Sequence, residues 1–227
     1  MNGRLYQKIA PFYYAVLYLV FKLYTFILDL PIFLTYPKLA MLHIRLWIFY
    51  SFSYSSAKHE REINALGVDP MELVDGLTPY STFAKILSNI DVPDSTIFYD
   101  LGCGHGNLVF YMNIKYGAQS IGMELVPTYV KTAQRIRDAF NMTDVSFKTG
   151  DFLDADLSNG TLFFVAGTCF NTHTQTRLIS LLSHIQPGSV VISTSYPIAH
   201  HEFVLLKKIR VPFSWGMGHL FLQKKEC

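Results

Sequence analysis

The order of apolar and polar positions divides the chain into two parts of different character. Ile9 to Leu28 form a run of 20 residues that carries a single charge, Lys22. About 20 apolar residues are what a helix needs to cross the hydrocarbon core of a bilayer. A second apolar stretch covers residues 32–54 but includes Lys38 and Arg45. Because charged side chains are costly at depth in lipid, the pattern favours a surface position for this second stretch.

Residues 1–54 are therefore predicted to form an apolar helical segment that associates with a membrane, and the first run either spans the bilayer or lies along it. Arg4 and Lys8 precede the run, as in an uncleaved anchor whose N-terminal flank stays on the cytoplasmic side. Tyr and Trp are frequent here and suit the headgroup region. Alternatively, these helices pack as a lid on the following domain or form a dimer interface, since apolar stripes at helical spacing are commonly core.

Residues 55–77 are more polar, and glycines and prolines interrupt short helical stretches there, which predicts a connector. A domain should follow at residues 78–227, where β-branched and aromatic strands alternate with helices. The expected strands lie at about residues 96–101, 120–126, 145–152, 161–167 and 189–196, and the expected helices at about 80–90, 107–116, 127–140 and 174–184.

This alternation implies βαβ crossovers and a parallel sheet that is covered on both faces. Residues 204–225 instead hold two apolar runs around Trp215-Gly216, which predicts a terminal hairpin. The expected fold class is thus α/β, with a Rossmann-like, mostly parallel seven-stranded sheet, a terminal antiparallel hairpin and apolar N-terminal helices. A chain of 227 residues has room for one such domain and an appendage.

The formal net charge of +2 is unevenly distributed. Residues 1–62 hold seven basic and three acidic residues and residues 63–227 hold twelve and fourteen, so the two parts carry +4 and −2. The cations of the first part are interleaved with apolar runs, which favours an anionic membrane surface over nucleic acid as a partner. Cys103, Cys169 and Cys227 lack metal-binding spacing. Neither a disulfide framework nor a metal site is therefore expected, and a reducing compartment fits.

The strongest chemical pattern is D-L-G-C-G-H-G, which contains Asp100, Gly102, Gly104 and Gly106 between a predicted strand and a predicted helix. Glycines at such a turn let the backbone approach a ligand, and the helix N-terminus offers unpaired N–H groups. Dinucleotide folds use G-x-G-x-x-G, whereas the spacing here is G-x-G-x-G. A carboxylate at the strand end would repel a pyrophosphate but could pair with the ammonium group of a methionine. The loop therefore predicts S-adenosylmethionine as the cofactor.

Two later acidic residues extend the predicted cofactor site. Glu124 ends the second predicted strand, where a carboxylate can accept both ribose hydroxyls, although dinucleotide folds share this geometry. Asp151 follows the third predicted strand and is placed to bind the adenine amino group, with Phe152 beside it to cover the ring. The alternative for Asp151 is a helix or loop cap.

The motifs DLGCGHG, ELV around Glu124 and GDF at residues 150–152 resemble, in order and spacing, the class I S-adenosylmethionine-dependent methyltransferase superfamily over residues 78–227. The runs GDFLDADLSNGTLFFVAG and LLSHIQPGSVVISTSYP are similar to two groups of lysine methyltransferases. One group is the non-SET histone lysine enzymes. The other is the membrane-anchored enzymes related to the ATP synthase c-subunit lysine methyltransferase, which also carry an apolar N-terminal anchor.

The resemblance implies that the loop from Thr78 to Tyr80 closes over the methionine end of the cofactor. It also implies cofactor contacts from Asp100, Gly102, Gly104, Gly106, Glu124 and Asp151. The chain departs from the histone enzymes at residues 167–171, where they have an Asn-rich turn and this chain has Gly-Thr-Cys-Phe-Asn, so the choice of substrate stays open. The Asp/Asn-Pro-Pro-aromatic motif of amide and adenine methylation is absent from the sequence.

Methyl transfer from a sulfonium is an in-line displacement, which requires alignment and exclusion of water more than acid or base groups. Tyr80, Thr168, Asn171 and Tyr196 fall in the entry loop or at predicted carboxyl ends of strands, where the crevice of an open α/β sheet lies. The first three are our catalytic candidates. For each of them the alternative is an ordinary loop or core residue.

The leading hypothesis is a membrane-associated protein lysine methyltransferase whose catalytic domain lies on the cytoplasmic or an equivalent reducing side. A second hypothesis is methylation of a lipid-soluble small molecule, such as a quinone precursor or a lipid headgroup. A third is a non-catalytic fold that binds S-adenosylmethionine and serves as a membrane interaction module. The complete set of Asp100, glycines and Glu124 argues against this third possibility.

Overall fold

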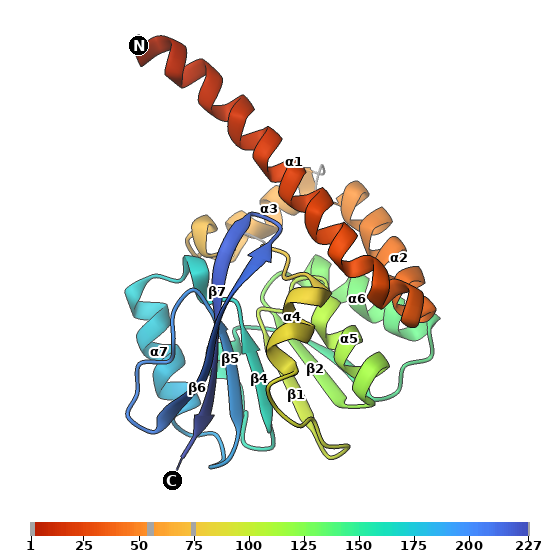
Figure 1. The fold of residues 1–227 in the computed structure, drawn as a ribbon, viewed down its shortest axis with the longest axis vertical. Helices are drawn as coiled ribbons and strands as arrows, with labels where there is room; N and C mark the ends of the chain where they lie inside the picture. The colour runs from red at the N-terminus through yellow and green to blue at the C-terminus, as the bar shows by residue number, and fades with distance from the viewer. Residues whose placement is uncertain (1–2, 54–56, 74–75, 227) are drawn as a thin grey trace.

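The computed structural model describes residues 3–53, 57–73 and 76–226. Seven strands form one sheet in the order β3-β2-β1-β4-β5-β7-β6 (Figure 1). The first five strands are parallel, and β7 pairs antiparallel with both β5 and β6. The strands are β1 (Ile97–Leu101), β2 (Gln119–Glu124), β3 (Val145–Thr149), β4 (Leu162–Val165), β5 (Val190–Thr194), β6 (Phe203–Phe213) and β7 (Gly216–Lys225). The predicted fold class, including the terminal hairpin, is confirmed.

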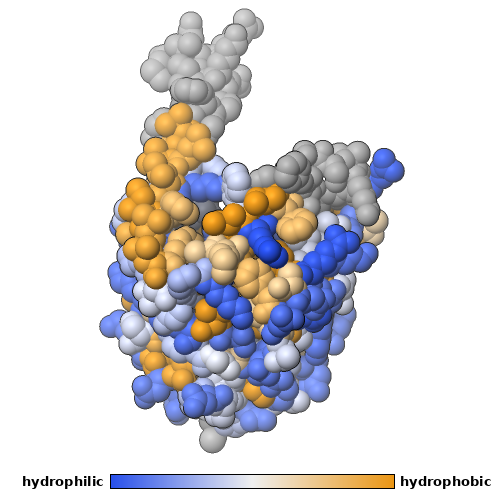
Figure 2. Space-filling view, turned by 90° about the vertical axis from the view of Figure 1, so that its right-hand side faces the viewer, coloured by the Kyte–Doolittle hydropathy of each residue, from blue (hydrophilic) through white to orange (hydrophobic). Residues whose placement is uncertain are grey.

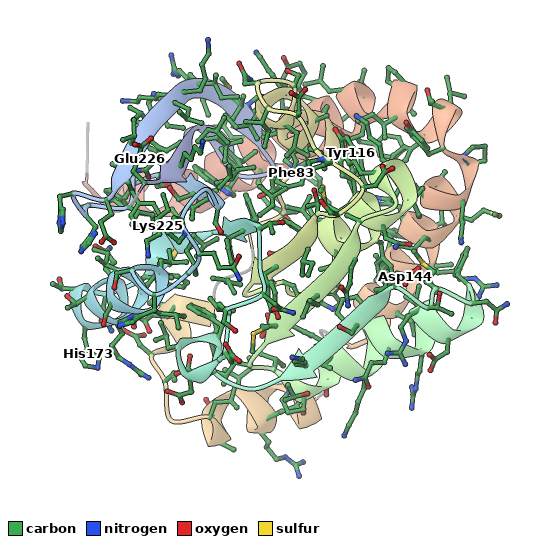
Figure 3. The ribbon with its side chains drawn as sticks, turned by 90° about the horizontal axis from the view of Figure 1, so that it is seen from below. Phe83, Tyr116, Asp144, His173, Lys225 and Glu226 are labelled. Atoms are coloured by element: carbon green, nitrogen blue, oxygen red, sulfur yellow. The ribbon has the colours of Figure 1, made fainter. Side chains whose placement is uncertain are left out.

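Helices cover both faces of this sheet because alternate strand residues point to opposite sides. Phe98 and Phe164 face α4 (Tyr80–Leu87) and α5 (Asn107–Tyr116). Tyr99 and Phe163 face the opposite layer, which contains α7 (Thr172–Leu182). Helix α6 (Pro127–Ala139) packs with α5 against β3. Figure 3 shows Phe83 of α4 and His173 of α7 on opposite sides of the sheet.

The apolar N-terminal part forms two helices, α1 (Gly3–Thr35) and α2 (Pro37–Ser53), that meet at Tyr36. Three leucines of α2, Leu39, Leu42 and Leu46, are buried against α5 and α6. The last turns of α1 pack on α4 and β6, while its N-terminal half extends past the domain (Figure 1). Packing on the domain, the alternative to membrane association, therefore applies to α2 and to the end of α1.

The middle of α1 is largely uncovered. Within the part of the chain that the structure describes, one helical stretch, Val16–Thr35, is long and apolar enough to cross a membrane, and 11% of its apolar window is buried. Figure 2 shows apolar residues gathered along this helix. Two shorter helices, α3 (Ala57–Ala65) and η1 (Pro70–Leu73), then lead to the domain.

Candidate functional site

The loop after β1 takes its shape from three glycines with left-handed backbone. Gly102, Gly104 and Gly106 have φ angles of 85°, 54° and 82°, which a side chain disfavours. The N–H of Gly102 donates to the carbonyl of Met123 at 2.9 Å, so the loop folds back on the end of β2. At Gly106, an added Cβ would lie 2.3 Å from the ring of Phe147. Both backbone angle and packing therefore require glycine at this position.

Glu124 connects this loop to the end of β2. Its Oε2 accepts the N–H of Gly104 at 2.9 Å and its Oε1 accepts the N–H of Val126 at 2.8 Å. The side chain is buried, and burial raises the pKa of the carboxyl above its usual range, while the backbone N–H donors lower it. Each carboxylate oxygen keeps further acceptor capacity. Glu124 can therefore hold the glycine loop and still accept hydroxyl groups of a ligand.

Two neighbouring cavities lie at the carboxyl ends of β1, β2 and β4, which is the edge where α/β sheets bind ligands. The outer cavity has a volume of about 370 Å³ and the inner one about 50 Å³. The outer volume falls in the range of small-molecule sites, roughly 300–1,000 Å³. Both are lined by Gly76, Gly102, Gly104 and Ala166. The glycine loop thus forms the wall that they share.

Most of the predicted cofactor residues line these cavities. Asp100 and Thr78 line the inner cavity. Glu124, Asp151 and Phe152 line the outer one. The structure thus separates the residues predicted for the methionine end from those predicted for the ribose and adenine. Gly106 lines neither cavity and is the N-cap of α5.

Asp151 combines the predicted location with the alternative role of a cap. Its Oδ1 accepts the N–H of Leu153 at 2.9 Å, which caps the short helix η2 (Phe152–Asp154). Its Oδ2 lies 3.5 Å from the guanidinium of Arg177, which also lines the outer cavity and donates to Asp154 at 2.7 Å. Both carboxylate oxygens of Asp151 thus already have partners within the protein. A ligand that binds Asp151 would have to share an oxygen with these partners or displace Arg177.

The three catalytic candidates are not brought together. Asn171 lines the outer cavity, where its side chain caps α7 by accepting the N–H of Thr174 at 3.0 Å. Thr168 lies between the hydroxyls of Thr194 and Ser195, at 3.1 and 2.9 Å, and lines neither cavity. Tyr196 lines a separate cavity of about 240 Å³ beside β5.

Tyr80 is buried beneath the N-terminal helices and lines neither cavity. Its hydroxyl donates to Oδ1 of Asn107 at 3.1 Å and lies 3.4 Å from Nδ1 of His43 in α2. Burial, and then the negative charge of Asp29, raise the pKa of Tyr80 well above its usual range. Tyr80 therefore has the surroundings of a core residue, which was the alternative to a catalytic role. Its hydrogen-bond partner Asn107 nevertheless lines the inner cavity.

Asp29 of α1 holds the start of α4 through hydrogen bonds to its backbone. Its two carboxylate oxygens accept the N–H groups of Tyr80 at 3.1 Å and Ser81 at 2.7 Å. These are among the N–H groups that a helix leaves without an internal partner at its first turn. Asp29 thus caps α4 although it lies 51 positions before Tyr80 in the chain, and the capped turn begins two residues after Thr78 of the inner cavity.

The outer wall of the outer cavity is formed by residues that no local pattern in the sequence predicts. Residues 67–73, expected to be part of a connector, include Gly67, Val68, Asp69, Glu72 and Leu73, which line it. Glu72 accepts the N–H of Asn171 at 2.6 Å and the hydroxyl of Thr174 at 3.2 Å. The carboxylates in the predicted connector were the one feature of the sequence that could have indicated a role at the site. No local pattern, however, pairs Glu72 with a helix about a hundred positions later. Glu72 therefore fastens this segment to the start of α7.

Comparison with known families gives one match along most of the domain. The model of the histone methylation protein DOT1 family matches residues 71–209. The matched region begins within η1, so it includes Glu72 and the rest of the cavity-lining elements from that point onward.

Solved structures with the same fold include two that hold S-adenosyl-L-homocysteine. An RNA methyltransferase from Salinibacter ruber is 24% identical, with a TM-score of 0.56, over 66% of this chain and 94% of that one. Geranyl diphosphate C-methyltransferase from Streptomyces coelicolor A3(2) is 12% identical, with a TM-score of 0.55, over 66% and 79%. At these identities the likeness concerns the fold.

Among curated proteins, norajmaline N-methyltransferase from Rauvolfia serpentina is 32% identical over 101 residues. The match covers 43% of this chain and 35% of that protein, so the chain spans about a third of the length of this relative.

Proposed function

The chain belongs to the DOT1 family of histone methylation proteins and is by family and fold a class I S-adenosylmethionine-dependent methyltransferase, and from this premise we propose that it is attached to a membrane and methylates lysine side chains of proteins. The observation that carries the enzymatic part of this proposal is the arrangement of Asp100, the glycine loop and Glu124 around the two neighbouring cavities.

The chain's own residues fit the cofactor that the family implies. The glycine loop leaves open space beside Gly102, where a Cβ would meet no atom within 4 Å. Asp100 supplies a carboxylate in the inner cavity for an ammonium group, and Glu124 supplies acceptor oxygens in the outer cavity for ribose hydroxyls. Asp151 and Phe152 would hold the adenine.

When bound, S-adenosylmethionine supplies an electrophilic methyl group. The protein has to align an amine with that methyl group and to keep water away, because an aligned displacement needs little acid or base help. The segment from Gly67 to Leu73, fastened through Glu72, covers the outer cavity and contributes to excluding water.

Acidic side chains around the cavities favour a cationic acceptor. Asp69, Glu72, Glu124 and Asp151 line the outer cavity, against one guanidinium, Arg177. A negative lining attracts a lysine ammonium before it loses its proton. This charge balance supports a cationic side chain such as lysine as the acceptor, and the family's description as histone methylation proteins supports a protein as the molecule that carries it.

Membrane attachment rests on the exposed apolar residues of α1. We propose that the catalytic domain lies on the cytoplasmic or an equivalent reducing side. If α1 lies along the membrane, the basic flank of Arg4 and Lys8 shares that side, whereas a spanning α1 would separate the flank from the domain. Protease protection of intact membrane vesicles distinguishes the two arrangements.

The first test is calorimetric titration of the detergent-solubilised chain with S-adenosylmethionine, with Asp100→Ala as the variant and NAD as the control ligand. Saturable binding that the variant loses and NAD does not reproduce is the expected result. Absence of binding by a folded chain would contradict the enzymatic proposal, whereas binding without any methyl transfer would favour the non-catalytic membrane module.

The acceptor is then identified by transfer of a labelled methyl group to membrane fractions, followed by hydrolysis and separation of methylated lysines. A second candidate is N-methylation of a lipid-soluble amine, which the match to norajmaline N-methyltransferase favours. Label recovered in solvent-extracted small molecules rather than in protein would support that candidate.

A further inference from the structure

A further hollow lies between the N-terminal helices α1 and α2. It has a volume of about 440 Å³, and its walls include Leu23 and Phe26 of α1 and Ile44 and Trp47 of α2. Leu23, Ile44 and Trp47 are 61%, 56% and 58% exposed, although each is a large apolar side chain. Contiguous exposed apolar surface of this kind marks a binding site for an apolar ligand or a membrane.

This α1–α2 groove adjoins the inner cavity. Leu77 lines both the groove and the inner cavity that contains Asp100. The groove therefore lies on the outer side of the wall that encloses the proposed methionine end of the cofactor.

The accessible charge in the groove is positive. Lys22 is exposed at its edge, with its ammonium 5.7 Å from the ring centre of Tyr18. Asp29 also lines the groove, but it is 5% exposed and its oxygens accept the N–H groups that start α4. Burial, and then the charge of Lys22, lower the pKa of His43 to about 4, so this third titratable residue of the groove is neutral near pH 7. The groove thus combines apolar walls with one accessible cation.

We infer that this groove binds one acyl chain of an anionic phospholipid, with the lipid phosphate at Lys22. The apolar walls match hydrocarbon, and the exposed ammonium matches a phosphate at the mouth. The inference rests on the membrane attachment proposed above, in the arrangement with α1 along the membrane, because a spanning α1 would place Lys22 within the hydrocarbon core. It goes beyond that proposal because it names a lipid class and the residues that hold it.

Trp47 provides a direct probe. The chain has two tryptophans, Trp47 and Trp215, and Trp215 lies in the β6–β7 turn stacked on Phe213 at 4.9 Å. In a Trp215→Phe background, the full chain is reconstituted into phosphatidylcholine vesicles that contain increasing amounts of phosphatidylglycerol with brominated acyl chains. Seating in the groove predicts quenching of Trp47 that saturates at a low fraction of brominated phosphatidylglycerol. Brominated phosphatidylcholine should quench more weakly, and only in proportion to its amount.

Two matched substitutions on α2 separate the groove from general contact with lipid. Ile44 lines the groove, whereas Ile48, one turn later and 42% exposed, does not. Ile44→Asp should weaken the apparent affinity for brominated phosphatidylglycerol about tenfold, since it removes an apolar contact and adds a like charge to the phosphate. Ile48→Asp should leave it within about twofold. Lys22→Gln should lower the preference for phosphatidylglycerol over phosphatidylcholine about fivefold.

The outcomes distinguish this inference from the proposed function. Quenching that rises in proportion to lipid, or equal effects of Ile44→Asp and Ile48→Asp, would overturn the groove while leaving membrane attachment in place. Failure of the chain to associate with vesicles would overturn both groove and attachment, without bearing on the methyl-transfer assay. Retained binding of S-adenosylmethionine by each variant shows that it is folded.

Discussion

Replacement of Gly106 by alanine tests whether the shape of the glycine loop depends on packing as well as on backbone angle. An added Cβ would lie 2.3 and 2.6 Å from two ring carbons of Phe147, closer than real Cβ contacts. Gly117, at the other end of α5, has a similar φ of 66° but no atom within 4 Å of its Cβ position. Gly117→Ala is therefore a matched control that shares the backbone cost and lacks the clash.

The expected losses follow from these two terms. A left-handed alanine costs about 1–2 kcal/mol, so Gly117→Ala should lower the free energy of unfolding by about that amount. Overpacking in a close-packed core adds about 1–3 kcal/mol, so Gly106→Ala should lose roughly 2–5 kcal/mol. Gly106→Ala should also weaken binding of S-adenosylmethionine because Phe147 and the loop must move apart. Gly117→Ala should not, since a helix of 10 residues separates it from the loop.

Urea unfolding of the detergent-solubilised variants gives the stability differences, and calorimetric titration gives the affinities. Phe147→Leu, added to Gly106→Ala, should recover part of the loss because it shortens the opposing side chain. Equal losses for the two glycine variants, with no recovery by Phe147→Leu, would refute the packing argument and leave backbone angle as the sole requirement.

Three further predictions concern the carboxylates that hold the site. Because burial raises the pKa of Glu124 above its ordinary value of 4.5, the carboxylate gains its proton at a higher pH than a glutamate of ordinary pKa would as the pH falls. Affinity for S-adenosylmethionine should therefore decline in mild acid, and titrations with Glu124→Gln should show a weaker pH dependence. An unchanged pH dependence would argue against ribose binding by this group. Asp29→Ala should lower the free energy of unfolding by about 1–2 kcal/mol, because the cap of α4 is lost. Urea unfolding measures this loss, with Asp94→Ala as the control at an exposed position. Equal losses for the two variants would count against capping. Glu72→Ala should weaken cofactor binding by about three- to tenfold, because the hydrogen bonds that Glu72 accepts hold residues 67–73 over the outer cavity and each contributes a net of about 0.5–1.5 kcal/mol. If calorimetry finds no change in affinity, residues 67–73 do not help to close the cavity over the cofactor.

The sequence by itself determined the sheet and the glycine loop, because both are encoded locally. Strands buried on both faces are apolar along their whole length, as residues 162–165 are, and helices between them have their own period. Left-handed backbone selects glycine at particular positions, so the glycine spacing, together with the carboxylate of Asp100, distinguishes this loop from a dinucleotide loop. The carboxyl ends of adjacent parallel strands then bring Asp100 and Glu124 to one edge.

Only the tertiary structure decided what happens where distant segments meet. Tyr80, expected at the site, turns into the core beneath α1 and α2, and Asp29 reaches its N–H across 51 positions. Residues 67–73, expected to be part of a connector, line the outer cavity because Glu72 contacts the start of α7. These outcomes depend on which apolar faces pack together, and local patterns predict that a helix has such a face without specifying its partner. For the same reason, the groove that contains Trp47 exists only once α1 and α2 lie side by side.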